Sequence, residues 1–363
     1  MRLLFVAQES FPGAQVGPRQ ALDRMLAQGE ISALSIFSLL WEAKQRKSDA
    51  AALEALFDLA QASRSDIVLW QTVGRFPVGE DYLRKLKDSV SAHYLAYQDG
   101  DPWGGARKPL SPAMKAMART ADLVFLCGLG RFRDVFRRAG AKRDLYCSHS
   151  VDTERFGKNS LPSAESQVER PFDAVMIGNL VGSRIPFLYS LPGARRRFEA
   201  ARKLGETLGS RFAVFGRGWP DLPFVKGPIP FDQQEAANQQ AWVTAGWDHY
   251  DRTPYYFSDR LPIALLSGVP HVTNYQPGFE HIFPPDSGIF FAKNPDEMVD
   301  VVLRLLSRPP AERIALGERA RCLAENRLLA TDVFGEMVRT VIREAYAAKG
   351  VSSPLARAQT MRS

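Results

Sequence analysis

A polar loop that enters an apolar helix, with a second acidic loop after it, is the clearest chemical pattern in the sequence. Residues 258–260 read Ser-Asp-Arg, an apolar helical run and Gly268 follow, and a short apolar run over 271–274 leads to residues 277–280, Pro-Gly-Phe-Glu. This order places backbone amides, an arginine and an acid at one end of a parallel sheet, where anionic nucleotides commonly bind. The pattern predicts a nucleotide site.

Helix capping can explain some, but not all, of the residues 258–260. Ser258 and Asp259 are good N-cap residues, and capping is a complete structural explanation for both. Capping does not explain Arg260, because a cation is disfavoured at a helix N-terminus unless an anion lies nearby. A diphosphate would supply that anion.

Two glycine turns follow expected strands earlier in the same half. Gly178-Asn179 and Gly216-Arg217 would let backbone amides approach a phosphate or a base, although a plain turn before a helix explains them equally well. Arg184 follows Gly178 closely and could bind a diphosphate through two hydrogen bonds, or lie on the surface.

An acidic loop lies in the first half of the chain. Asp99 and Asp101 follow an apolar run and precede residues 102–105, Pro-Trp-Gly-Gly. A carboxylate there could orient or deprotonate a substrate hydroxyl, but acidic turn residues beside Gly and Pro are also common for structural reasons. The spacing is not treated as a metal motif, and no metal is expected.

Short β-branched or apolar runs alternate with helical patterns, which predicts an α/β protein with parallel sheets. A polar segment over 157–171 divides the chain into two Rossmann-like halves, 1–156 and 172–331, followed by a helix at 332–348 and a disordered tail at 349–363. Expected strands cover 2–7, 67–71, 91–98, 123–127, 144–147, 172–177, 211–215, 241–244, 269–274 and 288–291. Expected helices include 51–62, 80–87, 112–118, 194–208, 232–237, 261–267, 295–306 and 310–329.

Composition narrows the classes of protein. The 363 residues suit two domains, and Cys127, Cys147 and Cys322 are too dispersed for a disulfide framework or a zinc cluster. The apolar start is too short for a signal peptide, so a cytoplasmic protein is expected. The net charge of +7 suits an anionic partner, namely a phosphorylated donor, a membrane surface or nucleic acid, although many soluble enzymes are mildly basic.

A family resemblance rests on several of these segments in order. Residues 150–156, Ser-Val-Asp-Thr-Glu-Arg-Phe, resemble the G-V-D-x-x-x-F stretch at the domain junction of GT-B glycosyltransferases, with Ser150 where Gly is usual. The turns at 178–179 and 216–218 and the helix at 258–270 resemble the donor-binding segments of these enzymes. The match is strongest to the bacterial spore-maturation-type branch of the retaining, family-four-like enzymes.

The resemblance departs from the family at its acidic pair. Family-four enzymes usually carry two glutamates, and the corresponding positions here are Tyr255 and Ile263. Neither side chain can accept a hydrogen bond as a carboxylate would. Asp259 and Glu280 are candidate substitutes, and retention at the anomeric carbon stays open.

The resemblance also implies roles for further residues. It implies a GT-B architecture of two Rossmann-like domains with an interdomain cleft, an N-terminal acceptor domain and a C-terminal donor domain. His149 would lie at the domain junction as a candidate catalytic residue, although a lone histidine is more often structural, and the loop with Gly13 would approach donor phosphate and acceptor. Tyr275, Gly278, Phe279 and Glu280 would contact the donor sugar and ribose.

The function that follows is transfer of a sugar from a UDP-, GDP- or dTDP-sugar, without a further cofactor or a metal, as in polysaccharide biosynthesis. The acceptor would be a glycan, a lipid-linked molecule or another hydroxyl compound. Peripheral contact with the inner face of the membrane stays open for this cytoplasmic protein. Two other classes stay open: a non-catalytic sugar- or partner-binding protein on the same scaffold, and a sugar transferase that modifies nucleic acid. The sequence leaves the oligomeric state undetermined.

Overall fold

The computed structural model describes residues 1–74, 76–91, 93–103, 108–160, 170–182 and 191–350. Contacts divide the chain into two compact units, one formed by Met1–Ser148 with Ala330–Ser363 and the other by His149–Leu329. The division lies before the expected boundary at residue 156. Most of the expected linker, residues 161–169, lies outside the described residues. The same holds for nearly all of the expected tail, residues 351–363.

The first unit is built on a six-stranded sheet in the order β2-β1-β3-β4-β5-β6, and all of its strand pairs are parallel. Its central strands are mostly apolar and buried, as a parallel sheet covered by helices on both sides requires. The strands are β1 (Arg2–Ala7), β2 (Ala33–Ser38), β3 (Ile67–Gln71), β4 (Tyr94–Asp99), β5 (Leu123–Leu126) and β6 (Asp144–Tyr146).

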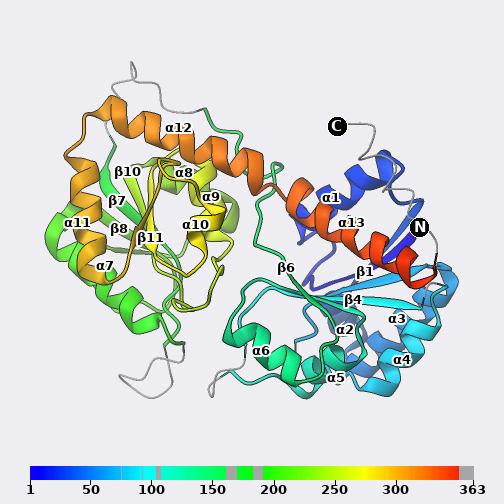
Figure 1. Cartoon of the computed structure of the whole chain (residues 1–363). Coiled ribbons are helices and arrows are strands. Elements are labelled where there is room, and N and C mark those ends of the chain that lie inside the picture. Colours follow the sequence, from blue (N-terminus) through cyan, green and yellow to red (C-terminus); the bar gives the residue numbers. More distant parts are fainter. Residues whose placement is uncertain (75, 92, 104–107, 161–169, 183–190, 351–363) are drawn as a thin grey trace. The chain divides into compact units, whose positions relative to one another are not determined.

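Helices cover both faces of this first sheet (Figure 1). On one face α1 and α13 pack together over the core residues of β1, β3, β4 and β5. The last helix therefore joins the first unit, although it follows the second unit in the sequence. The helices are α1 (Val16–Ala27), α2 (Leu39–Arg46), α3 (Asp49–Ala62), α4 (Glu80–Asp88), α5 (Pro112–Thr120), α6 (Arg131–Arg138) and α13 (Ala330–Ala348).

The second unit has a parallel sheet of its own, in the order β12-β11-β10-β7-β8-β9. The strands are β7 (Phe172–Ile177), β8 (Phe212–Phe215), β9 (Val225–Gly227), β10 (Ala241–Gly246), β11 (His271–Asn274) and β12 (Ile289–Ala292). Its helices are α7 (Ala194–Leu208), α8 (Gln234–Gln239), α9 (Arg260–Leu266), α10 (Phe279–Ile282), α11 (Pro295–Leu306) and α12 (Pro310–Arg327), with 3-10 turns at η1 (Gly209–Arg211) and η2 (Phe231–Gln233).

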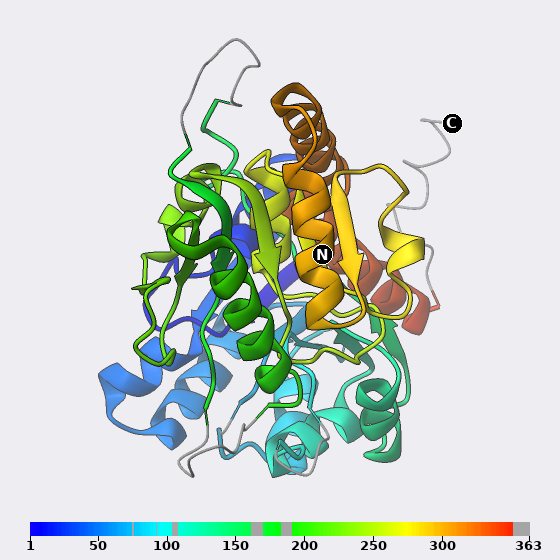
Figure 2. The same ribbon diagram turned by 90° about the vertical axis from the view of Figure 1, so that its left-hand side faces the viewer.

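Two apolar layers enclose this second sheet. Figure 2 shows α7 (green) and α11 (orange) crossing the face of the sheet nearer the viewer, and their side chains share a core with β7, β8 and β10. A second cluster joins α9, α10 and α12. The predicted α/β class with two Rossmann-like units is confirmed.

Candidate functional site

The carboxyl edge of the second sheet has a natural site where the chain changes direction. From β7 the chain proceeds to β8 and β9 on one side, and then returns to β10 on the other side of β7. Ligands of open parallel sheets bind outside the carboxyl ends of the strands at such a reversal. The residues that follow β7 and β10 are therefore the first to consider.

Two glycine turns touch at this edge. The Gly178 N–H donates to the Phe215 carbonyl over 2.8 Å, and the Trp219 indole N–H donates to the Gly178 carbonyl over 2.7 Å. A Cβ on Gly216 would lie 2.2 Å from the Gly178 oxygen, so a larger residue does not fit there. The Arg217 N–H donates to the Asn179 side-chain oxygen over 2.8 Å and ties the second turn to the first.

Two guanidinium groups converge on the first turn. A Cβ placed on Gly178 would lie 3.3 Å from Nη1 of Arg197 and 3.5 Å from Nε of Arg260. The buried Arg197 comes from α7 and donates from Nη1 to the Asn179 carbonyl over 2.6 Å. Arg260 begins α9 and has a half-buried side chain. Glycine leaves open the space between these two cations.

Burial and the nearby Arg260 charge lower the pKa of Arg197 to about 9. Burial also lowers the pKa of His249, to about 2, with Arg197 and Arg260 adding to the shift, so this imidazole is neutral. Its Nδ1 lies 3.3 Å from Nη1 of Arg197 and must accept, because arginine only donates. An anion between the two guanidinium groups would relieve their mutual repulsion.

Asp248 balances part of this positive charge from the end of β10. Burial raises the pKa of Asp248, while Arg197, a hydrogen bond from Ser258, Arg260 and His149 oppose that rise. His149 also contacts the Tyr256 ring edge to face, with 5.9 Å between ring centroids. The second unit thus brings His149 beside the predicted helix-start residues.

A small polar cavity opens among these groups. It has a volume of about 30 Å³, which suits ordered water rather than a nucleotide. A nucleotide would lie outside it, against the glycine turns. The lining includes Arg197, Asp248, Ser258, Arg260, His271 and Thr273.

The start of α9 differs from the sequence prediction. Asp259 is the N-cap residue but makes no side-chain capping hydrogen bond, and the Ser258 hydroxyl bonds Asp248 instead. Capping is therefore not what these side chains do. Asp259 lies 3.7 Å from Arg260, oxygen to nitrogen, in a partly exposed ion pair.

The loop after β11 contains two predicted residues that interact with each other. Tyr275 donates its hydroxyl to Glu280 over 3.1 Å, and the Gly278 N–H donates to the same carboxylate over 3.2 Å. Phe279 is fully buried and packs against Phe257, so its side chain belongs to the core rather than to a donor site. Burial of the aromatic ring explains why this prediction is wrong for the Phe279 side chain.

The two positions where glutamates were expected have structural roles. Ile263 is buried in the apolar cluster beneath α9 and does not face the polar cavity. Tyr255 has a positive φ of 64° and stacks on His281, and its hydroxyl lies 2.6 Å from Nδ1 of that histidine. A Cβ on Gly278 would lie 2.5 Å from the Tyr255 ring, so glycine is required for this packing.

In the first unit, the two predicted carboxylates have different surroundings. Asp99 is fully buried and accepts from the Tyr97 hydroxyl over 2.6 Å and from the Asp101 N–H and the Trp103 indole over 3.1 Å each. Burial raises the pKa of Asp99 to about 7. It fixes its own loop, so it does not reach a substrate hydroxyl directly. Asp101 is exposed and pairs with Lys108 over 3.0 Å.

Two other predicted residues remain. Gly13 lies in the loop after β1 with a positive φ of 93°, and a Cβ there would meet no atom within 4 Å. Arg184 lies outside the described residues.

The sequence analysis did not identify Arg197 as a residue of this site. Arg197 was visible only as part of a run of arginines at 195–197. It shares a helical face with Ala200, Ala201 and Leu204, which are buried. A charged residue on an apolar helical face is the signal that could have identified it.

A family model matches part of the chain. Residues 195–331 match a family model described as glycosyl transferase-like. This region begins in α7, next to Arg197, and includes Arg260 and the loop with Glu280. None of the curated proteins searched matches the chain.

Solved structures share the fold over nearly the whole chain. Anabaena HepE in complex with UDP and glucose has a TM-score of 0.61 at 14% identity and covers 94% of this chain and 99% of its own. Sucrose-phosphate synthase from Thermosynechococcus elongatus has a TM-score of 0.63 at 11% identity, covering 96% and 100%. A UDP-forming trehalose-phosphate synthase from Burkholderia xenovorans has a TM-score of 0.57 at 14% identity, covering 94% and 99%. The predicted resemblance to GT-B glycosyltransferases is thus confirmed at the level of the fold, and the chain is a GT-B-fold protein with a glycosyl transferase-like region in its second unit.

Proposed function

We propose that the protein transfers a sugar from a nucleotide-sugar donor to an acceptor hydroxyl, and that the second unit binds the donor. The observation that carries this proposal is that the guanidinium groups of Arg197 and Arg260 both lie close to Gly178. Their place at the reversal point of the sheet suits a diphosphate. A solved structure with the same fold contains UDP and glucose, which supports the choice of ligand.

The chemistry assigned to these residues is stabilisation of the leaving group. The acceptor oxygen forms a bond to the anomeric carbon, the bond from that carbon to the diphosphate oxygen breaks, and the hydroxyl proton is released. The electron pair of the broken bond stays on the diphosphate, where Arg260 and Arg197 offset the added negative charge. Fixed cations act in this way without reorganising during the reaction.

The test is titration of the full chain with UDP, GDP, dTDP, ADP and CMP by calorimetry, for the wild type and Arg260→Ala. Loss of a hydrogen bond to a charged group costs about 1.5–3 kcal/mol, so we expect about ten- to a hundredfold weaker binding of the preferred nucleotide. Arg304→Ala is the matched control, because Arg304 is exposed near the end of α11 and its replacement by alanine removes the same charge.

The outcomes separate the alternatives. Unchanged affinity in Arg260→Ala, or no binding of any of the nucleotides by folded wild type, would remove the donor site from this edge. Nucleotide binding without transfer to any acceptor would favour the non-catalytic alternative. That alternative is compatible with Ile263, which leaves an apolar side chain where an acid was expected.

In the described part of the chain, no helix combines the length and apolar character that a membrane span requires.

A further inference from the structure

A second pocket lies on the second unit, between the start of α7 and the loop that follows β10. It has a volume of about 430 Å³. Among the residues that the structure describes, its lining shares no member with the small polar cavity near Arg260. We call it the arginine pocket, and its lining is Pro192, Arg195, Arg196, Glu199, Asp251 and Arg252.

Backbone contacts hold the two sides of the arginine pocket together. The Gly193 N–H donates to the His249 carbonyl over 2.6 Å, and a Cβ on Gly193 would lie 2.3 Å from the Asp248 carbonyl oxygen. Glycine therefore lets the start of α7 lie directly against the loop after β10. The shape of the pocket is set by these contacts.

One carboxylate of the pocket is already bound. Oδ2 of Asp251 accepts from Nη1 of Arg196 over 2.9 Å and from the Trp247 indole N–H over 3.1 Å. The Asp251 side chain is 1% exposed. The charges of Asp251 and Arg196 thus compensate each other, and this pair forms a fixed part of the pocket wall.

The other three charged side chains have no such partner. The side chains of Arg195, Glu199 and Arg252 make no hydrogen bond or ion pair with any other residue in the described ranges. Arg195 and Arg252 are exposed, and Glu199 is half-buried. The pocket therefore offers two guanidinium groups and one carboxylate to a ligand.

The place of Arg195 on its helix adds to the attraction for an anion. α7 has 15 residues, and its first turn contains three arginines, residues 195–197, and no acidic residue. A helix N-terminus disfavours cations and favours anions, because its free N–H groups carry partial positive charge. An anion bound by Arg195 would be stabilised by the guanidinium group and by the helix together.

We infer that the arginine pocket is a second ligand site, and that it binds a phosphate-bearing molecule that also carries free hydroxyl groups. Arg195 and Arg252 suit the phosphate, because one guanidinium group can bind two phosphate oxygens. Glu199 suits a hydroxyl group, because a carboxylate only accepts hydrogen bonds and repels a second anion. The volume suits a small molecule of sugar-phosphate size. This site does not depend on the nucleotide site proposed above.

The test is calorimetric titration of the full chain with glucose 6-phosphate, inorganic phosphate and glucose. We expect glucose 6-phosphate to bind more tightly than phosphate, and glucose to bind too weakly to detect. Arg252→Ala should weaken glucose 6-phosphate binding about five- to tenfold, between the effect of an exposed ion pair and that of a hydrogen bond to a charged group. Arg304→Ala removes an exposed arginine of α11 and is the matched control, which should bind like the wild type.

Glu199→Ala tests the hydroxyl contact separately. Loss of the carboxylate removes a repulsion, so inorganic phosphate should bind about two- to fivefold more tightly. The preference for glucose 6-phosphate over phosphate should shrink, because its hydroxyl groups lose an acceptor. Alanine is a good helix former, so we expect the fold to be retained in a thermal melt. The same preference in Glu199→Ala as in the wild type would contradict a ligand with hydroxyl groups.

Arg260→Ala separates the arginine pocket from the nucleotide site. It should leave glucose 6-phosphate binding unchanged, whereas Arg252→Ala should leave nucleotide binding unchanged. The inference is overturned if folded wild type does not bind glucose 6-phosphate, if Arg252→Ala binds it normally, or if Arg260→Ala weakens it equally. Wild type that binds glucose 6-phosphate but none of the nucleotides would support the arginine pocket and contradict the donor site.

Discussion

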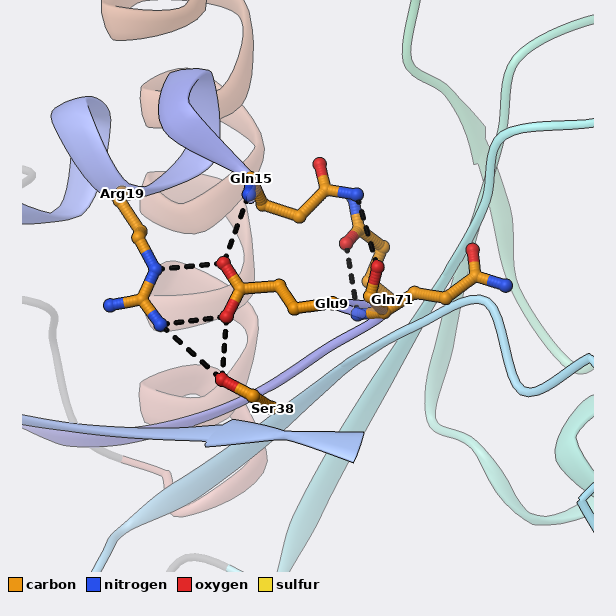
Figure 3. A network of polar contacts seen from close by, with 6 residues as sticks. Glu9, Gln15, Arg19, Ser38 and Gln71 are labelled. Atoms are coloured by element: carbon orange, nitrogen blue, oxygen red, sulfur yellow. Dashed lines mark hydrogen bonds and ion pairs between the residues drawn. The ribbon is translucent and has the colours of Figure 1, made fainter. Parts of the chain in front are cut away.

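Buried charges of opposite sign lie beside the carboxyl edges of the two sheets. Arg197 in the second unit lies beside a second cation and is balanced only in part by Asp248, whereas Glu9 in the first unit is matched by Arg19 (Figure 3). An unbalanced buried charge is costly and suggests a ligand that completes it, while a balanced one suggests a structural role. The two buried charges thus differ in how far the chain itself compensates them.

Glu9→Gln should destabilise the first unit. Breaking a buried ion pair costs about 3–5 kcal/mol, and we expect about 3 because the Arg19 side chain is 26% exposed. The measurement is thermal unfolding at neutral pH. Glu54→Gln is the control, since Glu54 is an exposed residue of α3, and it should unfold like the wild type.

The effect of Glu9 should depend on pH. Its pKa is about 2 in the folded chain, below the ordinary 4.5, so its charge contributes stability above about pH 4.5 and that contribution is lost as the pH falls toward 2. The difference in melting temperature between wild type and Glu9→Gln should therefore shrink across this range. A constant difference would show that the charge of Glu9 is not what stabilises the loop.

Among the elements, α12 approaches the end of α9 unusually closely. A Cβ on Gly317 would lie 2.0 Å from the Gly268 carbonyl oxygen, so glycine is what lets α12 reach the turn after α9. This contact supports the helix that carries Arg260. The packing of α12 thereby fixes part of the candidate site without touching a ligand.

Gly317→Ala should separate α12 from this turn and destabilise the second unit by about 1–3 kcal/mol, the usual cost of overpacking. Gly335→Ala is the matched comparison, since Gly335 lies within α13 and a Cβ there would meet Arg339 no closer than 3.6 Å. That change should stabilise the first unit by about 0.5–1 kcal/mol. Thermal unfolding of both variants measures the two changes in stability. Equal changes would contradict the close contact between Gly317 and the Gly268 carbonyl.

The sequence predicted central elements better than peripheral ones. The runs for β1 and β3 match the structure at both ends, because most of their residues are apolar and buried. The run for β7 also matches at both ends, although Asp173 interrupts it. The edge strands β2 and β9 were not predicted. β2 is only partly buried, and Ser35 and Ser38 interrupt its apolar run.

At the scale of the molecule, the two units repeat one architecture with different chemistry. Each has a six-stranded parallel sheet with a reversal point, flanked by guanidinium groups in the second unit and by amides in the first. A shared fold therefore determines where a ligand binds, and side chains determine which ligand.

Hydrogen exchange can assign the two edges separately. A nucleotide at a hundred times its dissociation constant stabilises the folded state by about 2.7 kcal/mol, and segments near the ligand gain protection against local opening. With UDP we expect slower exchange at 176–180 and 246–260, and unchanged exchange at 8–15. Protection of residues 8–15 without any change in the second unit would show that the nucleotide binds the first unit, and would contradict the proposed donor site.

The sequence by itself determined the α/β class, the two units and the segments that form the carboxyl edge around Arg260, because periodicity and turn residues are local properties. Tertiary structure decided which side chains meet. It placed Arg197 beside Gly178, turned Phe279 and Ile263 into the core, and enclosed Asp99. Burial depends on what packs over a residue, and that partner comes from distant parts of the chain.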